Sequence, residues 1–501
     1  MKRSLLGLAL MASFMAADAQ PMLVKDINPG TSSSFPSRIT AFGKKLVFSA
    51  DDGTNGFELW SMDTSGPNIA FNINPANAAG LPYGAARPMP TLGKYVYFPA
   101  NNGTSGQELY RWDGTNPPAL IADVYAGANS SFVDEVVMMN GKIYFDGTDG
   151  VYGEELWMFD TMTNMATRLT DIYAGATGSS ITNITVYNNK LYFGANSATA
   201  GQELFSYDPA TNATALVMDI DAGTNSSSPN NMVVINGKLY FTATTVANGR
   251  ELYSYNGTAV VRLTDVITGA SSGINASGTG VPMIVGMGNA VYFSGNESTT
   301  STGHLYKYDP ATGITTLVYK INPTGSSSIS GFVNYGSKIV FAANNGTLGS
   351  ELWWYKGAGI PALVGDIRPG SIGSTPTDMT VLNGTLYFAA ADSVDGNELF
   401  KFYDSTALGI TNVAFTGSVN VYPNPAHSTV TVDISVSETT TLAMKLVDIT
   451  GKVVYFAPAT TYEKGAHQTN FPVNNLATGT YLYTFFDNNG RVMVSGRLLK
   501  D

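Results

Sequence analysis

Short apolar runs separated by polar turns recur along most of the chain. In one clear unit, the apolar run 134–139 precedes the turn 140–142, and a second apolar run, 143–145, follows it. The turn reads Asn-Gly-Lys, and Asn-Gly between two apolar runs favours a type I′ hairpin, because that turn needs positive φ at both central positions. A polar loop, a Glu-Leu-aromatic run and a fourth apolar run complete the unit. The pattern therefore predicts four short strands in each unit.

The Glu-Leu-aromatic run returns at a nearly fixed period. Its leucines stand 50, 47, 48, 48, 53, 47 and 47 residues apart, and they are Leu59, Leu109, Leu156, Leu204, Leu252, Leu305, Leu352 and Leu399. A period of this size indicates a repeat architecture, in which each unit needs a neighbour to cover its apolar faces. The second run of a unit, such as Leu-Tyr-Phe at 191–193, lacks polar alternation, which is typical of a strand covered on both faces. Sheets stacked around an axis as the blades of a β-propeller provide that environment.

The two ends of the repeat region complement each other. The segment 22–27, Met-Leu-Val-Lys-Asp-Ile, matches the fourth run of a unit, and the last unit has no recognisable fourth run after Tyr403. An N-terminal strand that completes the last sheet removes the unpaired edges of an open array. An open solenoid also stacks repeats, but its units are usually shorter and it needs capping repeats. We therefore predict an all-β fold, in which an eight-bladed β-propeller spans 20–404 and is closed by the N-terminal strand.

The pattern changes after the repeat region. A linker at 405–417 leads into 418–501, where short alternating runs are separated by turns that contain glycine. Short strands at this spacing predict a small Ig-like β-sandwich. We therefore expect a second, smaller domain after the propeller.

The first residues predict export from the cell. A basic start and a short apolar run precede Ala-Asp-Ala at 17–19, which forms a cleavage site between Ala19 and Gln20. The apolar run is too short for a membrane anchor. We expect 1–19 to be a signal peptide that is removed, and we expect no transmembrane segment in the mature chain.

Composition and charge exclude several classes of function. The formal net charge is −11, whereas a nucleic-acid partner needs clustered Lys and Arg, so no such partner is expected. The chain has no cysteine, which excludes disulfides and thiolate metal sites. Of its 3 histidines only His304 lies in the repeat region, so a histidine-based acid–base constellation is not available there.

A glutamate precedes the leucine in seven of the units. Glycosidases use one pair of carboxylates across the scissile bond, whereas this residue recurs in one register along the chain. We therefore predict a structural role, in which each carboxylate accepts backbone N–H groups from a neighbouring loop. These glutamates are Glu58, Glu108, Glu155, Glu203, Glu251, Glu351 and Glu398.

Acidic residues assigned to the loops of the repeats are weak metal candidates. Ca²⁺ takes oxygen ligands from aspartate side chains and backbone carbonyls. Asp51, Asp52, Asp146 and Asp149 are the candidates, but their spacing does not match an EF-hand, and the second unit has asparagines in the corresponding loop. Solvated turn residues are the preferred interpretation and a calcium site is the alternative. No other cofactor is expected.

Two resemblances to known families rest on these motifs. Glu-Leu-Tyr-Arg-Trp-Asp-Gly-Thr at 108–115 departs from the ELWxxDGT motif only at its Trp, and the repeat region resembles the bacterial family named for that motif. In 418–501, Tyr-Pro-Asn-Pro at 422–425, Asp-Ile-Thr-Gly-Lys at 448–452 and Gly-Thr-Tyr at 479–481 follow the order of motifs in another family. This part resembles the type A sorting domain of the Bacteroidetes type IX secretion system. That resemblance implies Sec export, then translocation across the outer membrane with the type IX machinery as partner.

These features favour a protein that is secreted or held on the outer surface of the cell. We predict a non-catalytic recognition or adhesion module for a glycan or a protein. A polysaccharide-active hydrolase on a propeller scaffold and a structural surface-layer component are the alternatives. An enzyme should interrupt the repeat with unmatched acids, His, Tyr or Arg, whereas the main interruption, 269–281, is rich in Gly and Ser. The sequence leaves enzymatic activity undecided and favours its absence.

Overall fold

The computed structural model divides the chain into two compact units, Met1–Asp404 and Ser405–Asp501. The two units are described separately. The predicted signal peptide, with Ala19, and nearly all of the predicted linker lie outside the residues that the structure describes. The described residues are 20–63, 66–76, 78–83, 87–275, 280–404, 417–437, 439–448, 453–486 and 492–501.

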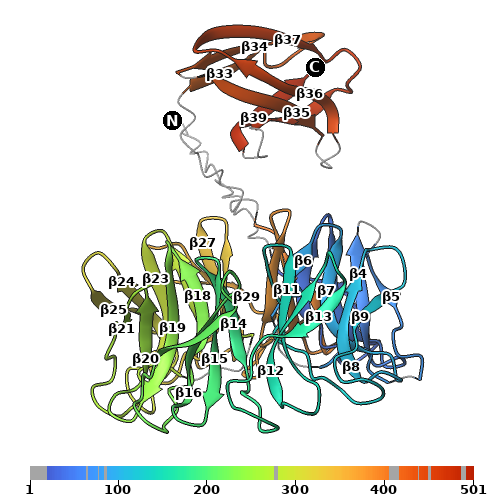
Figure 1. Cartoon of the computed structure of the whole chain (residues 1–501). Coiled ribbons are helices and arrows are strands. Elements are labelled where there is room, and N and C mark those ends of the chain that lie inside the picture. The colour runs from blue at the N-terminus through green and yellow to red at the C-terminus, as the bar shows by residue number, and fades with distance from the viewer. Residues whose placement is uncertain are drawn as a thin grey trace. The chain divides into compact units, whose positions relative to one another are not determined.

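The first unit consists of four-stranded antiparallel sheets, which stand next to one another in Figure 1. In seven of these sheets, the four strands follow one another along the chain. The strands of the first four are β2 (Ser37–Phe42), β3 (Lys45–Asp51), β4 (Phe57–Asp63), β5 (Gly66–Phe71), β6 (Thr91–Leu92), β7 (Tyr95–Asn101), β8 (Gln107–Trp112), β9 (Ala119–Ala122), β10 (Val137–Met139), β11 (Lys142–Thr148), β12 (Glu154–Asp160), β13 (Met165–Arg168), β14 (Thr182–Tyr187), β15 (Lys190–Ser197), β16 (Gly201–Asp208) and β17 (Ala213–Met218). The strands of the next three are β18 (Asn230–Ile235), β19 (Lys238–Thr245), β20 (Gly249–Tyr255), β21 (Val260–Arg262), β22 (Ile284–Met287), β23 (Ala290–Gly295), β24 (His304–Asp309), β25 (Ile314–Tyr319), β26 (Ser330–Tyr335), β27 (Lys338–Asn344), β28 (Ser350–Tyr355) and β29 (Ala362–Gly365).

The predicted turns and the apolar contacts between sheets are present. Between β10 and β11, Asn140 and Gly141 have φ angles of 51° and 76°, the left-handed values that an Asn-Gly hairpin turn needs. Neighbouring sheets share cores, since Tyr144 and Leu156 of one sheet pack with Phe193 of the next. Burial of both faces of the middle strands explains why these strands show no polar alternation in the sequence.

The N-terminal strand completes the last sheet. β1 (Met22–Lys25) pairs antiparallel with β32 (Asn397–Phe402), which is followed in the sheet by β31 (Thr385–Ala391) and β30 (Thr377–Leu382). The predicted pairing of the N-terminal segment with the last unit is therefore confirmed. This pairing joins residues that lie more than 370 positions apart in the sequence.

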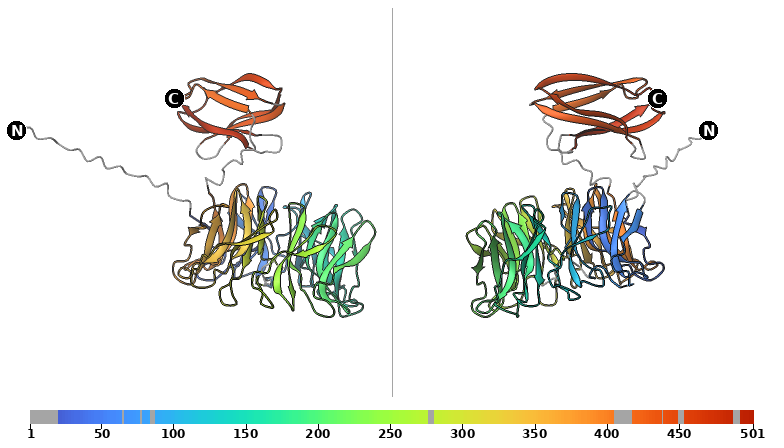
Figure 2. Two further views of the ribbon diagram at one scale, coloured as in Figure 1. Left: turned by 90° about the vertical axis from the view of Figure 1, so that its left-hand side faces the viewer. Right: turned by 45° about the vertical axis from the view of Figure 1, so that its right-hand side comes forward.

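The first strands of the sheets contact one another in chain order. β10 contacts β14, and the contacts continue through β18, β22, β26 and β30 to β2. Figure 2 shows the sheets of this unit side by side from two other directions. The second sheet is the exception, because its first strand, β6, contains only Thr91 and Leu92. Pro88 and Pro90 precede β6, and proline cannot donate a hydrogen bond to a strand ladder.

The second unit is a pair of antiparallel sheets around one core. The sheets have the strand orders β33-β34-β37 and β36-β35-β38-β39. Val432 and Phe471 from the first sheet share a core with Leu446 and Leu498 from the second. Among the described residues every regular element is a strand, and none is a helix that could cross a membrane. The strands of this unit are β33 (Gly417–Tyr422), β34 (Thr429–Val436), β35 (Thr440–Val447), β36 (Val453–Tyr462), β37 (Gly465–Pro472), β38 (Gly479–Phe486) and β39 (Val492–Lys500).

Candidate functional site

The repeated glutamates lie inside the sheets and accept hydrogen bonds from the connectors between units. All seven side chains are fully buried. Glu398 accepts hydrogen bonds from the N–H of Ile27 at 2.9 Å, from the N–H of Ser34 at 2.9 Å and from its hydroxyl at 2.5 Å. Burial raises the pKa of Glu58 and of Glu398 to about 7, although hydrogen bonds from the connector oppose the shift. These carboxyls are buried and hydrogen-bonded within the fold, so they are not available as catalytic groups.

In the unit that contains Leu305, the residue before the leucine is His304 instead of glutamate. His304 opposes Gly295 in the sheet, as Glu351 opposes Ala343 in the next one. The imidazole is fully buried, and its two nitrogens lie 2.7 Å from the hydroxyl of Ser327 and 2.8 Å from that of Ser301. Burial lowers the pKa of His304, so the neutral ring is favoured. His304 is therefore held by two serines inside its sheet.

The weak metal candidates serve as caps of turns or as buried acceptors. Asp52 accepts the N–H groups of Thr54 and Asn55, and Asp149 caps its own turn in the same way. Asp51 is the last residue of β3 and accepts the N–H of Gly53 in the turn that follows. The assignment of Asp146 to a polar loop is wrong, because this residue lies within β11. The described residues contain no group of three or more His, Asp or Glu side chains arranged to hold a metal ion.

Asp146 is an unmatched acid inside the third sheet. Its Oδ1 accepts the N–H of Asp134 at 2.9 Å and the N–H of Glu135 at 2.7 Å. Burial, with a contribution from the nearby charge of Glu154, raises its pKa well above the usual range for aspartate. Asp146 thus fixes the irregular segment that carries two further acids into β10.

A large cavity of the first unit lies along the first strands of the sheets. Its volume is about 750 Å³, and it is lined by parts of β2, β18, β22, β26 and β30. The lining combines apolar side chains with the amides of Asn236 and Asn334 and the hydroxyls of Thr40 and Thr380. Among the described residues that line it, none has an ionisable side chain. We call this space the inner cavity.

The segment 87–90 lies against the inner cavity where the short strand β6 leaves room for it. Pro88 lines the inner cavity and three smaller pockets around it. Arg87 donates to the carbonyl of Ile184 at 2.6 Å and forms an ion pair with Glu135 at 3.3 Å. This segment is an interruption of the repeat that the sequence reasoning missed. The two prolines were the signal that could have revealed it.

The second residue of β14, of β18 and of β30 has a positive φ, and its side chain links neighbouring sheets. The N–H of Asn231 donates to the side-chain oxygen of Asn183 at 3.2 Å. The N–H of Met283 donates to the side-chain oxygen of Asn231 at 3.3 Å. In the last sheet, Asp378 holds the same position and accepts the N–H of Arg38 at 2.8 Å. A side-chain carbonyl or carboxylate here therefore connects each of these strands to the next one.

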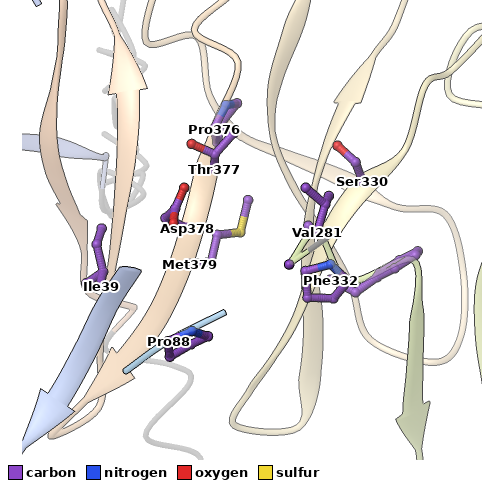
Figure 3. A pocket seen from close by; sticks show the side chains of 12 residues that line it. Ile39, Pro88, Val281, Ser330, Phe332, Pro376, Thr377, Asp378 and Met379 are labelled. Atoms are coloured by element: carbon purple, nitrogen blue, oxygen red, sulfur yellow. The ribbon is translucent and has the colours of Figure 1, made fainter. Parts of the chain in front are cut away.

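A smaller pocket beside the inner cavity contains Asp378 (Figure 3). Its volume is about 70 Å³, and most of its walls are apolar, including Ile39, Val281, Phe332 and Met379. Among the described residues that line this pocket, Asp378 is the only one with an ionisable side chain. Burial raises the pKa of Asp378 to about 6. We call this space the Asp378 pocket.

Comparison with known proteins assigns the C-terminal unit. Residues 420–496 match the family described as the secretion system C-terminal sorting domain. Such a domain indicates export through type IX secretion to the cell surface or the extracellular space. No curated protein matches the chain.

Several solved structures match the chain at low sequence identity. PorZ, a surface component of the type IX secretion system of Porphyromonas gingivalis, is 14% identical, with 92% of this chain and 64% of PorZ covered and a TM-score of 0.43. A puromycin hydrolase is 14% identical over 72% of this chain and 58% of its own, with a TM-score of 0.43. Sqt1 of Saccharomyces cerevisiae is 10% identical over 75% of this chain and 97% of its own, with a TM-score of 0.42. The chain thus spans only 64% of PorZ and 58% of the puromycin hydrolase. The activities of these proteins are not transferred to it.

Proposed function

We propose that this chain is a secreted or cell-surface protein whose first unit is a closed eight-bladed propeller of the ELWxxDGT-repeat kind. In this proposal the propeller is a non-catalytic recognition module that binds a glycan or a protein in the inner cavity. The pairing of β1 with β32 supports closure, because the last sheet takes its fourth strand from the N-terminal segment Met22–Lys25. The contacts from β10 through to β2 support an arrangement around one axis.

The lining of the inner cavity is the observation that carries the proposed role. General acid–base and nucleophilic catalysis need titratable or nucleophilic side chains at the reacting centre. The lining is instead apolar with a few amides and hydroxyls, such as Asn236 and Thr380, and the described residues in it are uncharged. A concave apolar surface with a few fixed polar groups is typical of a binding site.

Four charged residues around the short strand β6 are paired with one another. Arg38 binds Asp134 through Nη2 and Oδ1 at 2.7 Å, and Arg87 pairs with Glu135. Paired in this way, these groups stabilise the irregular segments around the short strand β6. None of these four groups is therefore the free acid or the free base that a polysaccharide-active hydrolase needs across its substrate.

A matched pair of arginine substitutions tests this proposal. Val234 lies on β18, is 41% exposed and lines the inner cavity, whereas Val261 lies on β21 of the same sheet and is 50% exposed. We expect Val234→Arg to abolish binding on arrays of glycans and peptides because its charged side chain enters the cavity. Val261→Arg is expected to bind as the wild type does, and both variants should keep their melting temperature within about 2 °C, as exposed sites tolerate substitution.

Two outcomes of this experiment contradict the proposal. Undiminished binding by Val234→Arg would move the ligand away from the inner cavity. Release of reducing sugars from a polysaccharide panel by the wild-type protein would favour the hydrolase instead.

A further inference from the structure

In two other sheets an amide fills the position of Asp378, whereas Arg38 fills it in β2 and Gly331 in β26. Asn183 and Asn231 stand at the corresponding place in their sheets, with φ angles of 58° and 55°, and Asp378 has a φ of 51°. All three use a side-chain oxygen to accept an N–H from a neighbouring sheet. The amide does this without burying a charge, which is costly when the charge is unpaired. The fold alone therefore does not require a carboxylate at 378.

The nearby cations do not neutralise Asp378. Arg38 donates its backbone N–H to Asp378, and its charge lowers the pKa of this carboxyl somewhat, but its guanidinium forms its ion pair with Asp134. Arg87 is bound to Glu135 and to the carbonyl of Ile184. Among the described residues no ion pair reaches Asp378. The carboxylate in this pocket is therefore hydrogen-bonded but has no direct ionic partner in the described part of the chain.

The shape and lining of the pocket select the kind of cation. A water-sized group needs about 10–15 Å³ of cavity volume, so the roughly 70 Å³ of this pocket accommodates about five heavy atoms. A lysine side chain has that number of atoms beyond its Cα. Ile39, Val281, Phe332 and Met379 offer apolar contacts to methylene groups, and an amino sugar with its hydroxyls would lose hydration against them.

We propose that the Asp378 pocket binds an alkylammonium group, that of a lysine side chain in a protein partner, with the carboxylate of Asp378 as its counter-ion. This inference deepens the proposed function, because the pocket adjoins the inner cavity through Pro88, Pro282, Phe332 and Met379. The partner's neighbouring residues then lie against the inner cavity. With a pKa raised by burial to about 6, Asp378 is ionised at pH 7.5.

The test compares charged and neutral probes on a variant that the chain itself shows to be tolerated. Nα-acetyl-lysine methylamide and its neutral isostere Nα-acetyl-norleucine methylamide are titrated at pH 7.5 by calorimetry or NMR. Asp378→Asn keeps a side-chain oxygen that can accept the N–H of Arg38. Asn183 and Asn231 accept N–H groups in the same way in their own sheets. Asp395→Asn removes the same charge from the loop between β31 and β32 and serves as the control.

We expect the wild type to bind the lysine probe about tenfold or more tightly than the norleucine probe, as a charge-assisted hydrogen bond gives. Asp378→Asn should lose this preference, and Asp395→Asn should keep it. Equal binding of both probes by the wild type, or an unchanged preference in Asp378→Asn, would overturn the inference. Tighter binding of glucosamine than of the lysine probe would overturn the assignment to a protein partner.

The two proposals fail in different ways. If Val234→Arg abolishes binding of an array ligand and Asp378→Asn leaves that binding unchanged, the role of the Asp378 pocket is refuted. The proposal of a recognition module is then retained. A preference for the lysine probe without any array ligand that depends on Val234 would refute the proposed function of the inner cavity. Melting curves of each variant establish that it is folded.

Discussion

Replacing Glu398 by alanine is expected to lower the free energy of unfolding by about 3 kcal/mol or more. The change removes the side-chain acceptor of the N–H groups of Ile27 and Asn28. It also removes one of the two acceptors of the Ser34 N–H and of the Ser34 hydroxyl, which both donate to the carbonyl of Asn397 as well. Each buried polar group left unpaired costs about 1–3 kcal/mol. The effect is expected to be large because Ile27 and Ser34 belong to the connector that follows β1, more than 360 residues away from Glu398.

Denaturant unfolding followed by tryptophan fluorescence measures this loss. Glu297→Ala is the matched control, because Glu297 is exposed and its described contact is an ion pair with Lys320. Exposed pairs of this kind contribute about 0–1 kcal/mol. If the two variants lose the same small amount of stability, the buried glutamate does not hold the connector in place.

The folded protein is expected to be more stable at pH 5.5 than at pH 8. Glu58 and Glu398 have folded pKa values of about 7, raised from 4.5 mainly by burial, and burial raises the pKa of the other five repeated glutamates as well. Between pH 4.5 and 7 the folded chain therefore holds more protons than the unfolded chain. The free energy of unfolding then falls as pH rises through this window.

For Glu58 and Glu398 we expect the change to be on the order of 2 kcal/mol each, after allowance for residual solvent screening. Scanning calorimetry at pH 5.5, 6.5, 7.5 and 8.0 measures it as a fall in melting temperature. Glu398→Gln should give a shallower dependence on pH than the wild type, since one titrating carboxyl is gone. A melting temperature that rises steadily from pH 5.5 to 8 contradicts the prediction.

Much of the fold could be predicted because it rests on local chemistry that repeats. The Asn-Gly turn at 140–141 needs positive φ, and the structure has it there. The Leu-Tyr-Phe runs predict strands covered on both faces, and Leu191 and Phe193 are fully buried. The N-terminal pairing could be predicted because a sheet with three recognisable strands leaves an edge to fill.

The features around the inner cavity could not be predicted because they depend on register between distant strands. Asp378 follows Pro376 in the sequence without any motif, and its equivalence to Asn183 and Asn231 appears only when the sheets are aligned in space. The sequence predicts a polar loop at Asp146, yet β11 continues through Asp146 and Gly147. In each case, long-range packing decides the role of the residue.

A disulfide between the two ends of the repeat region tests the central claim most directly. Met22 of β1 lies opposite Lys401 of β32, and paired antiparallel residues have Cα atoms about 4.5–5.5 Å apart, within the range of a disulfide. The natural chain has no cysteine, so a double variant with Met22→Cys and Lys401→Cys has a single pair to oxidise. Lys307 holds the position of Lys401 in another sheet, opposite Tyr292 as Lys401 is opposite Tyr387, and Met22→Cys with Lys307→Cys is the control. We predict near-complete cross-linking of the first variant, seen as faster migration on a non-reducing gel, and none of the second. Failure of Cys residues at 22 and 401 to cross-link in folded protein would contradict the joining of the two ends.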